Sequence, residues 1–247
     1  YKWQFFILIL FCFFWNSLSF PLFNDSTSTV IVTEKGELLA ARIANDGQWR
    51  FPQSDSVPEK FQTAIKYFED EYFNYHLGVN PISFFRAIKQ NISAGDVVSG
   101  ASTLTMQTIR LSRKGQYRTY SEKLIEIILA IRLELTKSKK SIMNLYASNA
   151  PFGGNVVGLD AASWRYYKRA SYQLSWGETA ALAVLPNAPS LIFPGKNHHL
   201  LLQKRNMLLQ KLMENGEIDS LTCELAQLEP LPGSPHALPQ ITPHLLN

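Results

Sequence analysis

Residues 119–135 read TYSEKLIEIILAIRLEL, and this stretch decides the expected fold class. Thr119 and Glu122 have the spacing of a capping box, which marks the start of a helix. The residues after them are apolar on two faces of a helical projection, and a helix that is apolar all round is usually buried. We therefore expect a long, buried helix here and a mainly α-helical chain.

Glu126 is the only charged residue between Leu124 and Ile131. A carboxylate in a buried helix needs a partner or a chemical role, because an isolated buried charge is costly. Lys123 lies three residues earlier and can reach it along the helix surface. The pattern leaves two interpretations open, a structural lysine–glutamate pair and a catalytic carboxylate.

Another helix is expected near Pro58, which suits a first helical turn. Apolar side chains follow at helical spacing, namely Phe61, Ile65, Phe68 and Tyr72. Projection places Glu69 at the edge of this apolar stripe and Asp70 on the opposite, solvated side. Partial desolvation would raise the pKa of Glu69 toward the range of a general base, and a solvated surface glutamate is the alternative.

Segments farther along the chain add to this architecture. Residues 29–42, TVIVTEKGELLAAR, predict a β-hairpin around Glu-Lys-Gly. Ser175 and Glu178 form a second capping box and open a helix that must end before Pro186. An amphipathic helix is expected over about residues 200–228, and the proline-rich tail from Pro230 indicates a linker.

The N-terminal segment points to a membrane. Residues 3–20 read WQFFILILFCFFWNSLSF, close to the run of about 20 mostly apolar residues that a spanning helix needs. Trp3 and Trp15 stand near its ends, as interfacial anchors do, and no A-x-A-like cleavage site follows. We expect an uncleaved anchor, with a signal peptide as the alternative, and in both cases the remaining chain lies outside the cytoplasm.

The expected divisions of the chain are an anchor over 1–23, a hairpin and linker over 24–55, the main domain over 56–229 and a linker over 230–247.

A run of cations lies before Glu126. Small and hydroxyl-bearing residues at 100–105, GASTLT, precede it. The run comprises Arg110, Arg113, Lys114, Arg118 and Lys123. Glu122 alone opposes it, so its net charge of +4 equals that of the whole chain. Hydroxyls followed by cations suit a phosphate group, either a lipid headgroup or a lipid-linked diphosphate, and a solvated basic face is the alternative.

The remaining features exclude several classes of protein. The composition, 46% hydrophobic and 18% charged, is that of a globular protein. No Walker P-loop, G-x-G-x-x-G, H-E-x-x-H or G-x-S-x-G motif occurs, so nucleotide-dependent enzymes, zinc hydrolases and α/β-hydrolases lack support. S-x-x-K and K-T-G motifs are also missing, and no nucleic-acid-binding module matches, so no nucleic-acid partner is expected.

Five segments, taken together and in this order, resemble glycosyltransferase family 51, the polymerase domain of class A penicillin-binding proteins. They are Glu69-Asp-x-x-Phe-x-x-His-x-Gly78, Gly100-Ala-Ser-Thr-Leu-Thr-x-Gln107, Arg118-Thr with Lys123-x-x-Glu126 and Leu133-Glu134, Lys140-x-Ile-x-x-Leu-Tyr146 with Ala150-Pro-Phe-Gly-Gly154, and Leu174-Ser-x-x-Glu178 through Ser190. Residues 46–52, DGQWRFP, and the Ala-Pro-Phe-Gly-Gly segment resemble the 1C subgroup. The chain departs from the family pattern at Asn80, Met106, Arg110 and Ala147-Ser148.

This resemblance implies a mainly α-helical, lysozyme-like domain with a small jaw subdomain, a short N-terminal β-hairpin and an N-terminal transmembrane helix. It implies polymerisation of lipid II into β-1,4-linked glycan strands with release of undecaprenyl diphosphate. Glu69 would be the base for the acceptor hydroxyl. Glu126, with Arg110 and Lys123, would handle the leaving diphosphate, directly or through a divalent cation, Mg²⁺ or Mn²⁺. The further substrate-binding residues implied are Asp70, Phe73, His76, Ser102, Thr103 and Gln107.

The partners implied are lipid II, the growing glycan strand, the membrane and other cell-wall synthesis proteins. The implied location is the cytoplasmic membrane, crossed once, with the catalytic domain on the periplasmic side.

Two other functions fit parts of the sequence. A lysozyme-like lytic enzyme would use a protonated carboxylic acid but has no need of the basic run. A non-catalytic lipid II-binding scaffold would be consistent with the Ala147-Ser148 departure.

Overall fold

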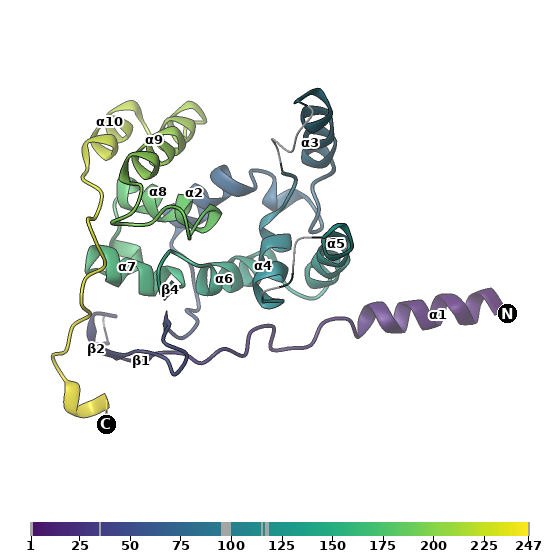
Figure 1. The fold of residues 1–247 in the computed structure, drawn as a ribbon, viewed down its shortest axis with the longest axis horizontal. Helices are drawn as coiled ribbons and strands as arrows, with labels where there is room; N and C mark the ends of the chain where they lie inside the picture. Colours follow the sequence, from purple (N-terminus) through teal and green to yellow (C-terminus); the bar gives the residue numbers. More distant parts are fainter. Residues whose placement is uncertain (1, 35, 95–99, 115, 117–118, 247) are drawn as a thin grey trace. The chain divides into compact units, whose positions relative to one another are not determined.

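The computed structural model describes residues 2–34, 36–94, 100–114, 116 and 119–246, and it is mainly α-helical, as expected (Figure 1). The chain divides into two units, and each is made of two stretches of sequence. The first unit comprises residues 1–24 and 72–142, and the second comprises residues 25–71 and 143–247. The expected jaw subdomain and the expected domain limits remain predictions.

The first unit is built around two packed helices. It contains α1 (Lys2–Trp15), η1 (Phe73–Tyr75), α3 (Pro81–Ala94), α4 (Leu104–Ser112), α5 (Tyr120–Glu134) and the start of α6 (Lys139–Asn149). α4 packs against α5. Gly78 lies against α5 with a φ of +82°, and a Cβ there would come within 2.8 Å of the Ala130 carbonyl group. Only a glycine allows this contact without a shift of the backbone.

α5 does not have the environment expected from its sequence. Leu129 and Leu133 are buried, but Leu124, Ile128 and Leu135 on the other face are 58%, 40% and 52% exposed. The prediction that the helix is buried on both faces is therefore wrong. The apolar pattern cannot distinguish a face that is covered by protein from one that is left open in the isolated chain.

α1 is shorter than the segment from which it was expected. It has 14 residues, about 21 Å at the usual rise per residue, whereas the hydrocarbon core of a bilayer is about 30 Å thick. Within the described ranges, the structure contains no helix with both the length and the apolar character needed to cross a membrane. The expected transmembrane helix over residues 1–23 is not confirmed.

The second unit has α8 (Trp176–Val184) at its centre. α8 packs against α2 (Glu59–Glu69), α7 (Leu159–Tyr167), α9 (His198–Glu214) and α10 (Ser220–Leu228). Its small residues allow this close packing, and a Cβ on Gly177 would meet the Ala226 carbonyl oxygen at 2.6 Å. The capping box at its start is confirmed, because Ser175 accepts from the Glu178 amide and the Glu178 carboxylate accepts from the Ser175 amide.

The single helix expected over about residues 200–228 is two helices, α9 and α10. The break is at Gly216, which has a φ of +75°. The Gly216 and Glu217 amides donate back to the last turn of α9, at the Met213 and Leu212 carbonyls. A glycine at positive φ is a common way for a helix to end, so Gly216 in the sequence indicates the break between α9 and α10.

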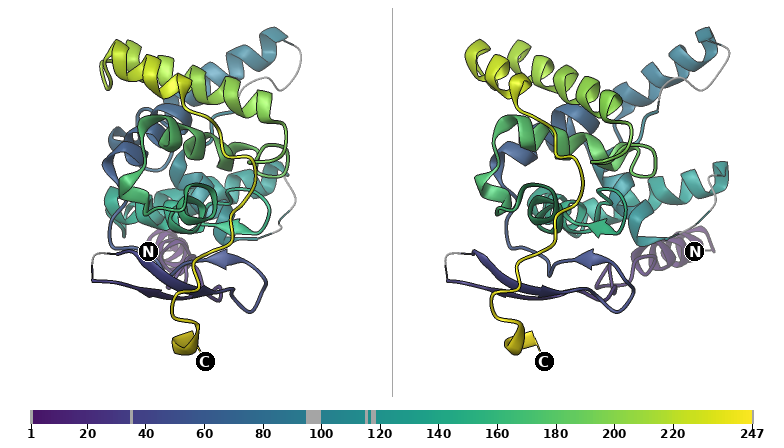
Figure 2. Two further views of the ribbon diagram at one scale, coloured as in Figure 1. Left: turned by 90° about the vertical axis from the view of Figure 1, so that its left-hand side faces the viewer. Right: turned by 60° about the vertical axis from the view of Figure 1, so that its left-hand side comes forward.

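The β-hairpin expected over residues 29–42 is confirmed. β1 (Thr29–Val32) pairs antiparallel with β2 (Leu38–Arg42). After α10 the chain runs back to this hairpin, as both views in Figure 2 show. There the Ile241 amide donates to the Leu39 carbonyl, and Leu238 is buried with Leu38 and Ala41. Two other short strands, β3 (Trp49–Arg50) and β4 (Val156–Val157), pair in parallel. The contacts of Leu238 and Ile241 with the hairpin show that the proline-rich tail is partly packed against the second unit.

Candidate active site

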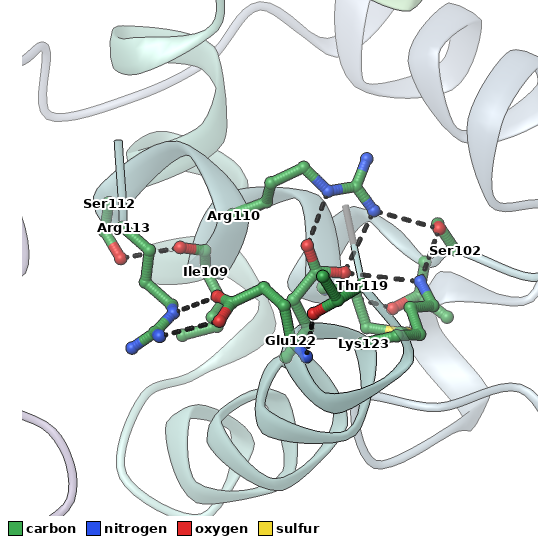
Figure 3. A network of polar contacts seen from close by, with 11 residues as sticks. Ser102, Ile109, Arg110, Ser112, Arg113, Thr119, Glu122 and Lys123 are labelled. Atoms are coloured by element: carbon green, nitrogen blue, oxygen red, sulfur yellow. Dashed lines mark hydrogen bonds and ion pairs between the residues drawn. The ribbon is translucent and has the colours of Figure 1, made fainter. Parts of the chain in front are cut away.

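The predicted site residues fall into groups that lie in different parts of the chain. In the first unit, α4, the residues just before it and α5 bring together four of them: Ser102, Arg110, Lys123 and Glu126. Figure 3 shows the side chains of Ser102, Arg110 and Lys123 pointing toward one another. Arg110 donates to Glu126 through two bonds, Nε to Oε1 at 2.7 Å and Nη2 to Oε2 at 3.0 Å. Lys123 Nζ lies 3.3 Å from Glu126 Oε2. Glu126 is thus a buried carboxylate held by two cations.

Ser102 connects the two cations to each other. Its hydroxyl oxygen accepts from Lys123 Nζ at 2.7 Å and from Arg110 Nη2 at 3.1 Å. Because the oxygen accepts twice, the hydroxyl hydrogen is left to donate elsewhere. These residues line a cavity of about 570 Å³, which Arg113 and Glu122 also line. Of the residues that the structure describes, two carboxylates and three cations therefore line this cavity.

The pKa of Glu126 lies below its ordinary value. Burial raises the pKa, but the hydrogen bonds and positive charge of Arg110, followed by those of Lys123, lower it by more. Glu126 is therefore ionised at neutral pH. Arg110 is its main partner, whereas helical spacing predicts only the contact with Lys123. The sequence shows that Arg110 carries a positive charge on the helix preceding α5. Only the tertiary structure shows that it contacts Glu126, which is 16 residues away.

Thr103 and Gln107 lie on the same helix as Arg110. Thr103 caps α4, and its hydroxyl accepts from the Met106 amide and donates to the Gly78 carbonyl at 2.6 Å. The Thr103 side chain is buried, so its visible role is to fix the start of α4 against Gly78. Gln107 is half-buried one turn further on. Arg118 lies outside the described residues.

Phe73 and His76 form a separate cluster in the first unit. Their rings meet edge to face at 6.4 Å, and Lys139 Nζ lies 4.5 Å from the centre of the Phe73 ring. Lys139 also donates to the His76 carbonyl and to Glu134 Oε1, each at 2.7 Å. The sequence pattern does not distinguish Lys139 from an ordinary surface lysine. Both predicted residues are buried in this packing.

Glu69 lies in the second unit, in the last turn of α2, and is half-buried. The Asn187 side-chain amide, from η3 (Leu185–Asn187), donates to Glu69 Oε1 at 3.3 Å. Lys204 on α9 donates to Asn187 Oδ1 at 2.9 Å. A chain of polar contacts thus leads from α9 to Glu69, and its two other members were missed because their partners are distant in sequence.

Asp70 is not solvated as predicted. It is 6% exposed, because α2 ends at Glu69 and Asp70 leaves the helical path with a φ of −159°. A helical projection has no meaning beyond the end of the helix.

The described residues do not form a metal site by themselves. Among them no group of three or more His, Cys, Asp and Glu side chains is placed to hold an ion. Both Glu126 oxygens and both Glu122 oxygens already accept from cations. A divalent cation at Glu126 would have to take its remaining ligands from the substrate.

Comparison with known proteins gives consistent results. A profile described as "Transglycosylase" matches residues 35–213. Penicillin-binding protein 1C of Escherichia coli is 36% identical over 224 residues, which cover 90% of this chain and 29% of that protein. Penicillin-binding protein 1A of Aquifex aeolicus is 36% identical over 72% of this chain and 24% of its own length. A putative transglycosylase of Cupriavidus necator is 35% identical over 71% of this chain and 75% of its own length. The chain thus spans less than a third of the two penicillin-binding proteins.

Proposed function

Because the chain belongs to the transglycosylase family, we propose that it is a peptidoglycan glycosyltransferase, which polymerises lipid II into β-1,4-linked glycan strands and releases undecaprenyl diphosphate. The observation that carries this proposal is the cavity of the first unit. Among the described residues of its wall, the cations Arg110, Arg113 and Lys123 face two carboxylates, those of Glu122 and Glu126. One positive charge of this group is therefore left over for an anionic ligand. A diphosphate leaving group is such a ligand.

In the proposed reaction, the acceptor 4-hydroxyl attacks the anomeric carbon of the donor sugar. The bond from that carbon to the diphosphate oxygen breaks, and the configuration inverts. Glu69 takes the hydroxyl proton, while the hydrogen bond from Asn187 holds its carboxylate in place. Arg110, Lys123 and the Ser102 hydroxyl stabilise the negative charge that develops on the departing diphosphate. Glu126 keeps the two cations in position.

Glu126 does not have the character of the acid in a lytic enzyme. Lysozyme-like cleavage requires a carboxylic acid that stays protonated, and enzymes obtain it by raising a pKa. The pKa of Glu126 is instead lowered. Glu126 is therefore suited to holding cations and is unsuited to donating a proton.

We further propose that residues 1–23 hold the protein at the cytoplasmic membrane, with the catalytic part on its periplasmic side. α1 exposes Trp3, Phe5 and Phe13, which are costly to leave in water. Arg132 of α5 donates twice to the Trp15 carbonyl, at 3.0 and 2.8 Å, and so joins the end of α1 to α5. Deleting residues 1–22 should sharply reduce binding to liposomes, measured by co-flotation. Undiminished binding would contradict this role for α1.

Replacing Glu69 with Gln tests the catalytic proposal. The change keeps the shape and removes the base, so polymerisation of lipid II should fall at least about 100-fold, the lower end of general-base effects. Glu71→Gln is the matched control, because Glu71 lies two residues away and pairs with Lys211 at 2.9 Å. It should keep near wild-type activity. A Glu69→Gln protein that polymerises at the wild-type rate would remove Glu69 from this role, and a wild-type chain that binds lipid II without polymerising it would indicate a scaffold.

A further inference from the structure

A second ion pair lines the same cavity. Arg113, which ends α4, donates through Nε and Nη2 to the two carboxylate oxygens of Glu122, in the first turn of α5 (Figure 3). The Nη2 to Oε2 distance is 2.9 Å. Neither side chain is fully buried, at 30% and 13% exposure, so the pair forms part of the cavity wall and remains within reach of a ligand.

The start of α5 does not need Glu122 to face Arg113. Thr119 caps the helix by accepting from the Glu122 amide at 3.1 Å. In a complete capping box, the glutamate side chain would turn back to the amide of the capping residue. Here the Glu122 carboxylate binds Arg113 instead. The hydrogen bond from Arg113 also lowers the pKa of Glu122, so the carboxylate keeps its charge at neutral pH.

This pairing changes the charge that the cavity offers to an anion. Arg110 and Lys123 face Glu126, which leaves a surplus of one positive charge. Arg113 would add a second, but Glu122 neutralises it. An anion that enters the cavity therefore competes with Glu122 for the Arg113 guanidinium, whose planar fork suits carboxylate and phosphate equally.

We propose that Arg113 and Glu122 form an electrostatic latch that limits how tightly the cavity binds a diphosphate. With the latch closed, the described side chains of the wall offer the ligand one surplus positive charge, and the departing diphosphate is held weakly enough to leave. When the ion pair between Arg113 and Glu122 is broken, the Arg113 guanidinium is able to bind the ligand. The identity of the ligand as a diphosphate rests on the proposed function, whereas the latch itself rests on the ion pair in the cavity wall.

The test is calorimetric binding of inorganic pyrophosphate to the purified full chain. Glu122→Gln leaves an amide of the same shape and frees Arg113, so pyrophosphate should bind about tenfold more tightly, as expected for one added charge near a multivalent anion. The double variant Arg113→Gln with Glu122→Gln has no charge at either position. Its affinity should return to within about threefold of the wild type, since a tenfold change corresponds to a single charge.

Asp46→Asn controls for the change in net charge. Asp46 pairs with Arg50 at 2.8 Å and does not line the cavity, so this variant should bind pyrophosphate as the wild type does. Thermal melts confirm that each variant is folded. The latch is overturned if Glu122→Gln binds no more tightly than the wild type, or if the gain persists in the double variant. A gain for phosphatidylglycerol vesicles without one for pyrophosphate would also overturn it.

The result of the pyrophosphate-binding test can be distinguished from the result of a lipid II polymerisation assay, which tests the proposed function. If the wild-type chain fails to polymerise lipid II while Glu122→Gln binds pyrophosphate more tightly, the latch stands and the glycosyltransferase proposal falls. If the chain polymerises lipid II while pyrophosphate binding is unchanged by Glu122→Gln, the reverse holds.

Discussion

The side chains around Glu126 differ in how deeply they are buried, and this decides what each contributes to stability. The Glu126 side chain is 5% exposed, whereas that of Lys123 is 38% exposed and its contact is the longest of the cluster. Removing one partner of a buried pair leaves a charge without compensation, but exposed pairs contribute little. The two cations therefore do not have equal roles.

We expect Glu126→Ala to lower the free energy of unfolding by about 3 kcal/mol or more, because it leaves Arg110 and Lys123 without their carboxylate. Lys123→Ala should cost less than about 1 kcal/mol. Arg110→Ala should destabilise as well as inactivate, since Arg110 supplies two of the three hydrogen bonds that described residues donate to Glu126. Urea unfolding of the three variants measures this. Equal stability of Glu126→Ala and the wild type would contradict the buried-pair assignment.

The same pair predicts a dependence of stability on pH. A group whose pKa is lower in the folded state stabilises the fold above its unfolded pKa, and this contribution is lost as the pH falls through the folded pKa. For Glu126 the loss should begin near its ordinary value of 4.5 and continue below it. The difference in unfolding free energy between the wild type and Glu126→Gln should therefore shrink between pH 6 and pH 3. A constant difference over that range would show that the carboxylate is not held ionised.

Among the elements, α5 depends on the glycine against which it packs. Gly78 and Gly216 have similar φ values, +82° and +75°, but a Cβ at Gly78 would strike the α5 backbone whereas nothing lies within 4 Å at Gly216. Gly216→Ala should cost about 1 kcal/mol, the strain of the left-handed region alone. Gly78→Ala should cost about 3 kcal/mol, because overpacking against backbone is added. Thermal melts of both variants compare them, and equal losses would mean that the contact between Gly78 and α5 is unimportant.

For the molecule as a whole, the last residues complete the second unit. Residues 238–241 return to the hairpin, where Leu238 covers Leu38 and Ala41. Leu238→Ala should therefore destabilise the chain by about 2 kcal/mol, the lower end of core leucine truncations. Leu245→Ala is the control, since Leu245 lies in the same tail and is exposed. If both variants melt at the same temperature, the tail is only a linker.

The sequence by itself determined the mainly helical class, the hairpin, the cap of α8 and the residues on α4 and α5 that carry charge. These features follow from local spacing, since caps, turns and helical faces depend on residues within a few positions of one another. The order of the five segments also indicated the family.

Only the tertiary structure decided which charges meet. Arg110 and Glu126 are 16 residues apart, Glu69 and Asn187 are 118 apart, and no periodicity connects residues at such distances. It likewise decided that one face of α5 stays exposed and that Asp70 is buried beyond the end of its helix. The physical reason is common to these cases. Burial and charge pairing depend on what the rest of the chain places against a residue, whereas the sequence pattern reports only what that residue could tolerate.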